Sequence, residues 1–212
     1  PCERGCMTGS YFSSQSSTLP AAFKTNNLTL KTDSVVERLE YNPETRRVDG
    51  VTVIDANTRE KTTYRGKLVF LCASTIGSTQ ILLNSKSASF PNGLANRSGV
   101  LGHYLMDHTA GLSARGVMPG YEEDYHYGNR PNGIYIPRFK NLDKQHTKFF
   151  RGYGFQGAGV RTDWRSVQAD EGGFGVGFKE KLQQPGPWIM LLAGFGEPLP
   201  RYDNAMKLSK TQ

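Results

Sequence analysis

The sequence predicts an α+β (mixed α/β) protein, in which a β meander and a strand–turn–helix unit precede a half built mainly of antiparallel strands. Three observations predict this class. Residues 67–71 form an apolar run that leads through small residues into a helical segment. Residues 28–64 contain strand-like runs separated by polar turns. From residue 110 onward, short strand-like runs alternate with Gly, Pro, Asn and Asp, and helix signals are few.

The first 64 residues predict one short helix followed by the meander. Residues 1–27 are rich in Ser, Gly and Thr, with a helix expected around 18–24. Turn residues at 42–47 and 57–60 separate strand-like runs that suit hairpins. The strands are expected at 28–32, 35–41, 48–55 and 61–64.

The segment 67–85 carries the strongest functional signal. Its apolar run, 67–71, suits a buried central parallel strand, with Cys72 as a small buried residue at its end. The turn 72–75 consists of small residues, and a helix is expected to begin near Ile76. Such a turn lets a backbone approach a nucleotide closely and presents helix N–H groups to an anion. The segment therefore indicates a dinucleotide site.

The second half is expected to form a separate, strand-rich domain. Residues 88–108 show little regular pattern, and near residue 110 the sequence changes to short strand-like runs separated by turn residues. We therefore predict two domains, 1–109 and 110–212. Strands of the second are expected at 112–117, 133–138, 148–153, 174–181 and 188–195.

One glycine motif imitates a pyrophosphate-binding loop. Gly152, Gly154 and Gly157 match G-x-G-x-x-G, but the residues after them lack a helical pattern and those before them are polar and aromatic. The motif therefore predicts a strand with spaced glycines, and the same interpretation applies to 172–177.

The chain offers no complete catalytic or metal-ligand pattern. Cys2 and Cys6 have no second ligand pair, and His103, His108, His126 and His146 match no ligand spacing. Asp107 beside His108 suggests general-base chemistry, but neighbouring residues seldom point the same way and the G-x-S-x-G elbow is missing. We expect His108 to make a structural hydrogen bond that holds the loop 102–108.

The charge distribution and the hydropathy of the chain bear on two classes of partner, nucleic acids and membranes. The chain carries 26 Lys and Arg against 19 Asp and Glu, a net charge of +7. These cations are scattered rather than grouped, so no nucleic-acid partner is expected. No run approaches the roughly 18 apolar residues of a membrane span. The aromatic residues of the second half are expected in a core or a substrate platform.

Several ordered segments together resemble the glucose–methanol–choline (GMC) family of FAD-dependent oxidoreductases. The resemblance spans nearly the whole chain, and it depends on the order and spacing of the segments more than on any one motif. The matching segments are 5–9 with 18–20, 36–39 within 28–55, 67–85, 90–96, 102–108, 136–139, 150–153 and 196–200 with Asn204.

The resemblance implies FAD as cofactor and four residues that contact its adenosine part. Val36 corresponds to the position whose backbone pairs with the adenine ring. Cys72, Ala73 and Ser74 correspond to a turn that is usually Ala-Ala-Gly, from which this sequence departs at Cys72 and Ser74. Residues 1–109 would be part of a Rossmann-like FAD-binding domain, and 110–212 part of the substrate-binding domain.

The resemblance also implies the reaction. A small-molecule alcohol, here a sugar or glycoside, would lose a hydride from its CH–OH carbon to the flavin, with oxygen, a quinone or a haem subunit as electron acceptor. The family's phosphate loop would precede residue 1 and its catalytic His would follow residue 212. We therefore expect the chain to be inactive by itself. The alternative is a non-catalytic, β-rich carbohydrate-binding module, which gives no reason for the segment 67–85.

Overall fold

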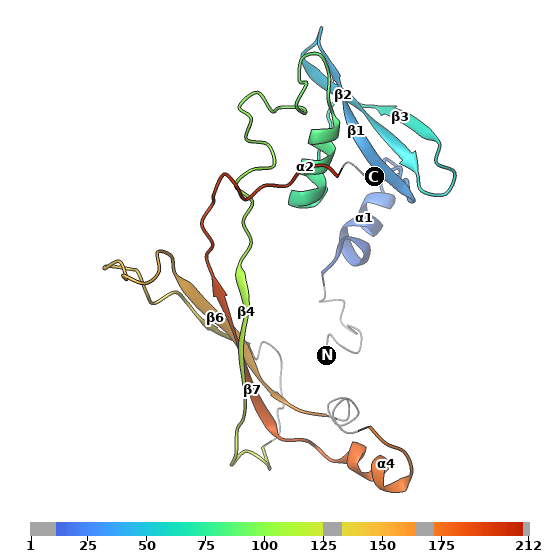
Figure 1. Ribbon diagram of the computed structural model, residues 1–212. Coiled ribbons are helices and arrows are strands. Elements are labelled where there is room, and N and C mark those ends of the chain that lie inside the picture. Colours follow the sequence, from blue (N-terminus) through green and yellow to red (C-terminus); the bar gives the residue numbers. More distant parts are fainter. Residues whose placement is uncertain (1–11, 125–132, 164–171, 210–212) are drawn as a thin grey trace. The chain divides into compact units, whose positions relative to one another are not determined.

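The computed structural model describes residues 12–124, 133–163 and 172–209, which form two compact units (Figure 1). The first unit takes the described residues up to Leu101 and those from Lys207 on, and the second is Gly102–Met206. Both contain helix and antiparallel sheet, in agreement with the α+β class. The predictions for Cys2, Cys6 and His126 fall outside the described residues.

The first unit begins with the predicted short helix. A π-helical turn, η2 (Ser14–Thr18), continues into α1 (Leu19–Phe23). Ser13 and Ser16 cap the start reciprocally, because each backbone N–H donates to the other side chain at 3.0–3.1 Å. The predicted strand at 28–32 is wrong, since these residues pair with neither sheet of the described structure.

The β meander is confirmed. Strands β1 (Ser34–Asn42), β2 (Arg47–Asp55) and β3 (Lys61–Arg65) form an antiparallel sheet in that order. The side chain of Asn42 accepts backbone N–H bonds at 3.0 and 3.2 Å in the first turn. In the second turn, the side chain of Asp55 accepts two backbone N–H bonds, both at 2.8 Å. Asx turns of this kind explain why local sequence located both hairpins.

Helix α2 (Ser74–Asn84) packs on β1 and closes the core of the first unit. Leu39 of β1, Ile81 of α2 and Leu94 are buried together. Ser85 joins strand to helix, because its hydroxyl accepts the N–H of Leu39 at 2.8 Å and donates to the carbonyl of Ile81 at 2.6 Å. The buried apolar side chains and the two hydrogen bonds of Ser85 therefore hold this helix against the sheet.

The predicted buried strand at 67–71 is wrong. These residues form no regular element and pair with no strand among those described. Val69 and Leu71 pack on the core, whereas Leu68 and Phe70 are 69% and 83% exposed. A central parallel strand needs neighbours on both edges and both faces, and the described residues cover one face. Cys72, expected to be buried, is exposed for the same reason.

The second unit is mainly an antiparallel sheet, as predicted. Its strands are β4 (Thr109–Val117), β5 (Gly133–Ile136), β6 (Tyr153–Arg161) and β7 (Trp188–Gly196). They lie in the order β4-β7-β6-β5, so the last strand in sequence inserts between β4 and β6. The strand expected at 148–153 is misplaced, because β6 begins where that prediction ends.

Helix α4 (Val176–Gln183) replaces the strand predicted at 174–181. Gly172, Gly173 and Gly175 adopt φ values of 61°, 135° and 91°, which lie outside the range of a β-strand. The glycines at 172–177 are therefore turn and helix residues rather than a glycine-spaced strand. No helix in the described part of the chain is long and apolar enough to cross a membrane.

Candidate functional site

The turn before α2 presents exposed backbone. Cys72, Ala73 and Ser74 are all exposed, and no side chain caps the helix start. Ser74 has φ 61°, a left-handed conformation that glycine adopts at much lower cost. The first N–H groups of α2 have no partners within the helix, so they carry its positive dipole end. This turn can accept a flat polar group or an anion against its backbone.

Val36 lies on an edge strand of the same unit. It pairs with Val53 of β2, and the register shifts between Val36 and Arg38. Its side chain packs on the core cluster that also receives Val69 and Leu71. The side chain is thus occupied by packing, which leaves the backbone as the part that a ligand at the free edge of β1 could contact. Both predicted cofactor-binding segments belong to this one unit.

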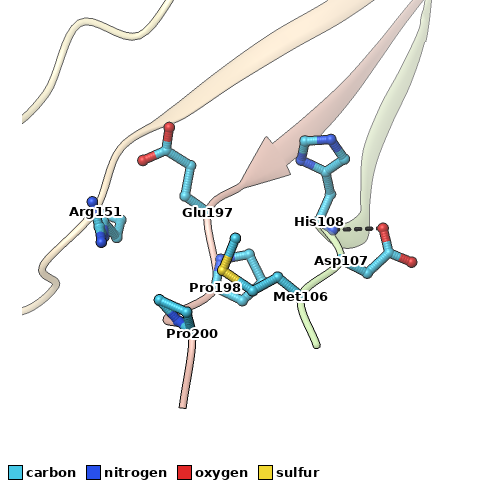
Figure 2. Close-up of a pocket in the computed structure, with 7 residues that line it drawn as sticks. All are labelled: Met106, Asp107, His108, Arg151, Glu197, Pro198 and Pro200. Carbon is cyan, nitrogen blue, oxygen red and sulfur yellow. Dashed lines mark hydrogen bonds between the residues drawn. The ribbon is translucent and has the colours of Figure 1, made fainter. Parts of the chain in front are cut away.

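A hollow of about 400 Å³ opens in the second unit (Figure 2). Asp107 accepts the backbone N–H of His108 at 2.7 Å, and the imidazole projects away from that carboxylate. The pair is therefore no acid–base dyad. The ring of His108 instead meets the ring of Phe195 edge-on, with centroids 5.9 Å apart. The hollow is lined by Met106, Asp107, His108, Arg151, Glu197, Pro198 and Pro200.

His103, rather than the side chain of His108, holds the loop 102–108. Its Nδ1 lies 2.7 Å from the carbonyl oxygen of Tyr202, and the two rings stack at 3.9 Å. Two backbone hydrogen bonds join the same segments. The N–H of Leu105 donates to the carbonyl of Asn204 at 3.0 Å, and the N–H of Met206 donates to the carbonyl of Gly102 at 2.9 Å. His108 makes the predicted hydrogen bond only through its backbone N–H, to Asp107, and the long-range hydrogen bond of the loop comes from His103.

Glu197, which sequence reasoning did not single out, has a defined position. Its Oε2 accepts the N–H of Gly152 at 3.3 Å and lies 3.6 Å from Nη1 of Arg138. The Arg138 guanidinium is itself oriented by the carbonyls of Lys140, at 3.1 Å, and Asn141. A Cβ at position 152 would lie 2.2 Å from Cδ of Arg138, so a larger residue there would displace this flexible side chain.

One face of the sheet carries an apolar hollow of about 490 Å³. Phe155 of β6 and Leu112 of β4 both register against Gly194 of β7, and the ring of Phe155 lies over this glycine, 3.3 Å from where a Cβ would be. Tyr153 and Phe155 contact each other at 5.7 Å between ring centroids. The surface can therefore receive a flat or branched hydrocarbon group.

The glycine-spaced strand predicted at 152–157 is confirmed. Gly154 and Gly157 lie within β6, and no helix follows them directly. A Cβ on Gly157 would lie 1.9 Å from the carbonyl oxygen of Leu191, so this glycine permits close strand packing. It does not form a pyrophosphate loop.

The chain is similar in sequence to known proteins. The model of the GMC oxidoreductase family matches residues 1–110. The chain is also similar to 2-methyl-1,2-propanediol dehydrogenase from Mycolicibacterium austroafricanum, with 32% identity over 127 residues. That alignment covers 60% of this chain and 22% of the relative, so the chain spans about a fifth of the relative's length.

Proposed function

This chain belongs to the GMC oxidoreductase family, and from that premise we propose that it forms part of a flavoenzyme that oxidises the CH–OH group of an alcohol. The observation that carries the proposal is the family match over residues 1–110, which includes the meander, the turn and α2. The name of the similar dehydrogenase, which refers to a diol, supports an alcohol as the substrate class.

The described residues of the first unit fit the adenosine end of FAD. The turn 72–74 is exposed and carries small side chains, and Ser74 has the left-handed backbone conformation that glycine favours, the residue usual at this position in the family. Val36 would pair with the adenine through its backbone at the free edge of β1, and Cys72, Ala73 and Ser74 would hold the adenosine. When bound, FAD would supply the acceptor for the hydride.

The diphosphate is not assigned to any residue. Within the described part of the first unit, no glycine-rich loop opens a helix. Without N–H groups arranged around the diphosphate, little would offset the cost of desolvating its charge. We therefore propose that this chain by itself neither retains FAD nor oxidises an alcohol. Visible flavin absorbance that persists through purification of the 212-residue chain would contradict this.

For the alcohol we propose a sugar or glycoside. The support is the second unit, where hydrogen-bonding side chains such as Arg138 and Glu197 lie beside the rings of Tyr153 and Phe195. Hydroxyl groups and the apolar faces of a sugar need both kinds of surface.

The full-length protein, assayed with an artificial electron acceptor, tests the proposed reaction. We expect glycosides to be oxidised and the flavin to be reduced in the absence of acceptor. Oxidation of sterols or aliphatic alcohols alone would overturn the sugar proposal. Sugar binding with no flavin and no oxidation of any alcohol would instead favour the carbohydrate-binding module.

A further inference from the structure

The register of the sheet in the second unit gives its two faces different characters. Leu112, Phe155 and Gly194 lie on one face, with the apolar hollow. Gln156 of β6 and Tyr135 of β5 line a polar hollow of about 230 Å³. Because successive residues of a strand point to opposite faces, this polar hollow lies on the other face of the sheet from the apolar one.

The polar hollow belongs to a row of residues that crosses the four described strands of this sheet. Ser113 of β4, Ala193 of β7, Gln156 of β6 and Tyr135 of β5 lie opposite one another in turn. Directly opposite residues of antiparallel strands share a face, and adjacent strands are about 4.8 Å apart. The row therefore extends about 14 Å across the sheet. Of the row, Gln156 and Tyr135 line the hollow, and the β4 end continues outside it.

The row offers hydrogen-bonding groups that the described residues leave unused. The side chains of Ser113, Gln156 and Tyr135 are exposed and make no hydrogen bond within the described part of the chain. Arg115, the next residue of β4 on this face, is also exposed and has no ion-pair partner among the residues described. A hydroxyl, an amide, a phenol and a guanidinium supply both donors and acceptors, the mixture that rings bearing several hydroxyl groups require.

Small and apolar side chains lie between these polar groups. Ala193 stands between Ser113 and Gln156 in the row, so a flat ring can approach the sheet there. Leu191, the preceding residue of β7 on this face, is 39% exposed, and Tyr135 is 68% exposed. Apolar surface beside hydrogen-bonding groups suits sugar rings, which present C–H groups on their faces and hydroxyl groups at their edges.

We infer that this polar face binds a chain of at least two sugar rings: one ring lies in the hollow at Gln156 and Tyr135, and the next lies along the row at Ser113 and Arg115. A single ring in the hollow would leave the β4 end of the row uncovered. The inference rests on the proposed function and deepens it, because it selects oligosaccharides over monosaccharides.

Ligand binding to the 212-residue chain tests the inference without requiring turnover. Glucose and cellobiose are titrated and followed by amide NMR, and cellobiose is the probe because its two rings form an extended chain. We expect cellobiose to bind about tenfold more tightly than glucose. It should shift the amide signals of Ser113 and Arg115, which glucose leaves unchanged. Equal affinities, or no binding of either sugar, would overturn the inference.

Phenyl glucoside is the matched control ligand. Its second ring carries no hydroxyl groups, so it cannot use the donors and acceptors at the β4 end of the row. We expect it to bind about as weakly as glucose. An affinity equal to that of cellobiose would show that the second position does not recognise a sugar, and would overturn the inference.

Two variants separate the two ring positions. Arg115→Ala should weaken cellobiose about tenfold and leave glucose unchanged. Arg201→Ala, at an exposed arginine outside the row and the three hollows, is its control. Tyr135→Ala should weaken both sugars, whereas Tyr64→Ala, at an exposed position of β3 in the first unit, should weaken neither. Cellobiose binding that Arg115→Ala leaves unchanged would overturn the inference.

The full-length protein separates this inference from the proposed function. We expect its kcat/KM to be about tenfold higher for cellobiose than for glucose. Equal values that Arg115→Ala does not change would overturn the inference and leave the proposed function intact. Tighter binding of cellobiose than of glucose, without oxidation of any alcohol, would count against the proposed function alone.

Discussion

The two units stabilise their sheets by different means. In the first, side chains from β1, α2 and the loop at Leu94 form a buried cluster. In the second, β6 and β7 pair over nine residues without a register shift, and Ile189 is the one buried hydrophobic side chain among those described. The comparison indicates that packing stabilises the first unit, while backbone pairing stabilises the second and leaves its faces open to ligands.

The largest effect should come from the core of the first unit. Ile81→Ala removes a buried side chain between α2 and β1, so we expect it to lower the free energy of unfolding of that unit by about 2–5 kcal/mol. Leu112→Ala, at an exposed position of the second unit, should cost less than about 0.5 kcal/mol. Urea unfolding followed by amide exchange in each unit measures both. Similar losses in the two variants would contradict the comparison.

Gly157→Ala tests the backbone packing of the second unit. The added Cβ would lie 1.9 Å from the carbonyl oxygen of Leu191, so β6 and β7 must separate locally, at a cost of about 1–3 kcal/mol. Gly159→Ala is the matched control, because a Cβ there meets no atom of the described residues within 4 Å. Faster amide exchange along β6 and β7 in the first variant alone is the expected result. If both variants exchange alike, close packing at Gly157 is not important.

Ser85→Ala should destabilise the first unit through a lost hydrogen bond. It leaves the N–H of Leu39 buried without its acceptor, which costs about 1–3 kcal/mol. Ser87 is the contrasting control, because its hydroxyl is buried without a partner in the structure. Ser87→Ala should therefore be neutral or slightly stabilising. The melting temperatures of the two variants test this difference. Equal destabilisation would show that the hydrogen bond from Leu39 of β1 to Ser85 is unimportant for stability.

Ser74→Gly should stabilise the turn before α2. Ser74 has φ 61°, and glycine adopts this conformation without the steric cost of a Cβ, so a gain of about 0.5–1 kcal/mol is expected. Ser78→Gly, in the interior of α2, should instead destabilise by a similar amount. A rise in melting temperature for the first variant and a fall for the second would confirm the left-handed turn.

The smallest expected effect is on the acid dependence of the first unit. The hydroxyl of Thr52 donates to Glu40 and, together with Arg38, lowers the pKa of that carboxyl. A lowered pKa in the folded state adds stability above the unfolded pKa, and this stability is lost as pH falls through the folded value. Thr52→Val should reduce the loss of stability between neutral and acid pH by about 0.5 kcal/mol. Thr63→Val, which leaves the bond to Glu40 in place, should preserve it.

Local signals explain which elements could be predicted. The meander was predictable because Asn42 and Asp55 make their turns with their own neighbouring backbone, and β7 because it is a long apolar run. The segment 67–71 has an equally strong apolar pattern, yet it forms no strand. Strand formation depends on partners distant in sequence, and the pattern does not show whether they are present.

The same distinction between local pattern and tertiary contact applies to the candidate sites. The sequence by itself determined the α+β class, the hairpins and the family, because these depend on composition, turn chemistry and the order of short segments. Only the tertiary structure decided that Ser74 is left-handed, that His103 rather than His108 holds its loop, and that Glu197 borders two surfaces. Glu197 contacts Gly152 and Arg138, which precede it in the sequence by 45 and 59 residues. Strand register brings these residues together, and register is a property of the folded sheet rather than of any local pattern.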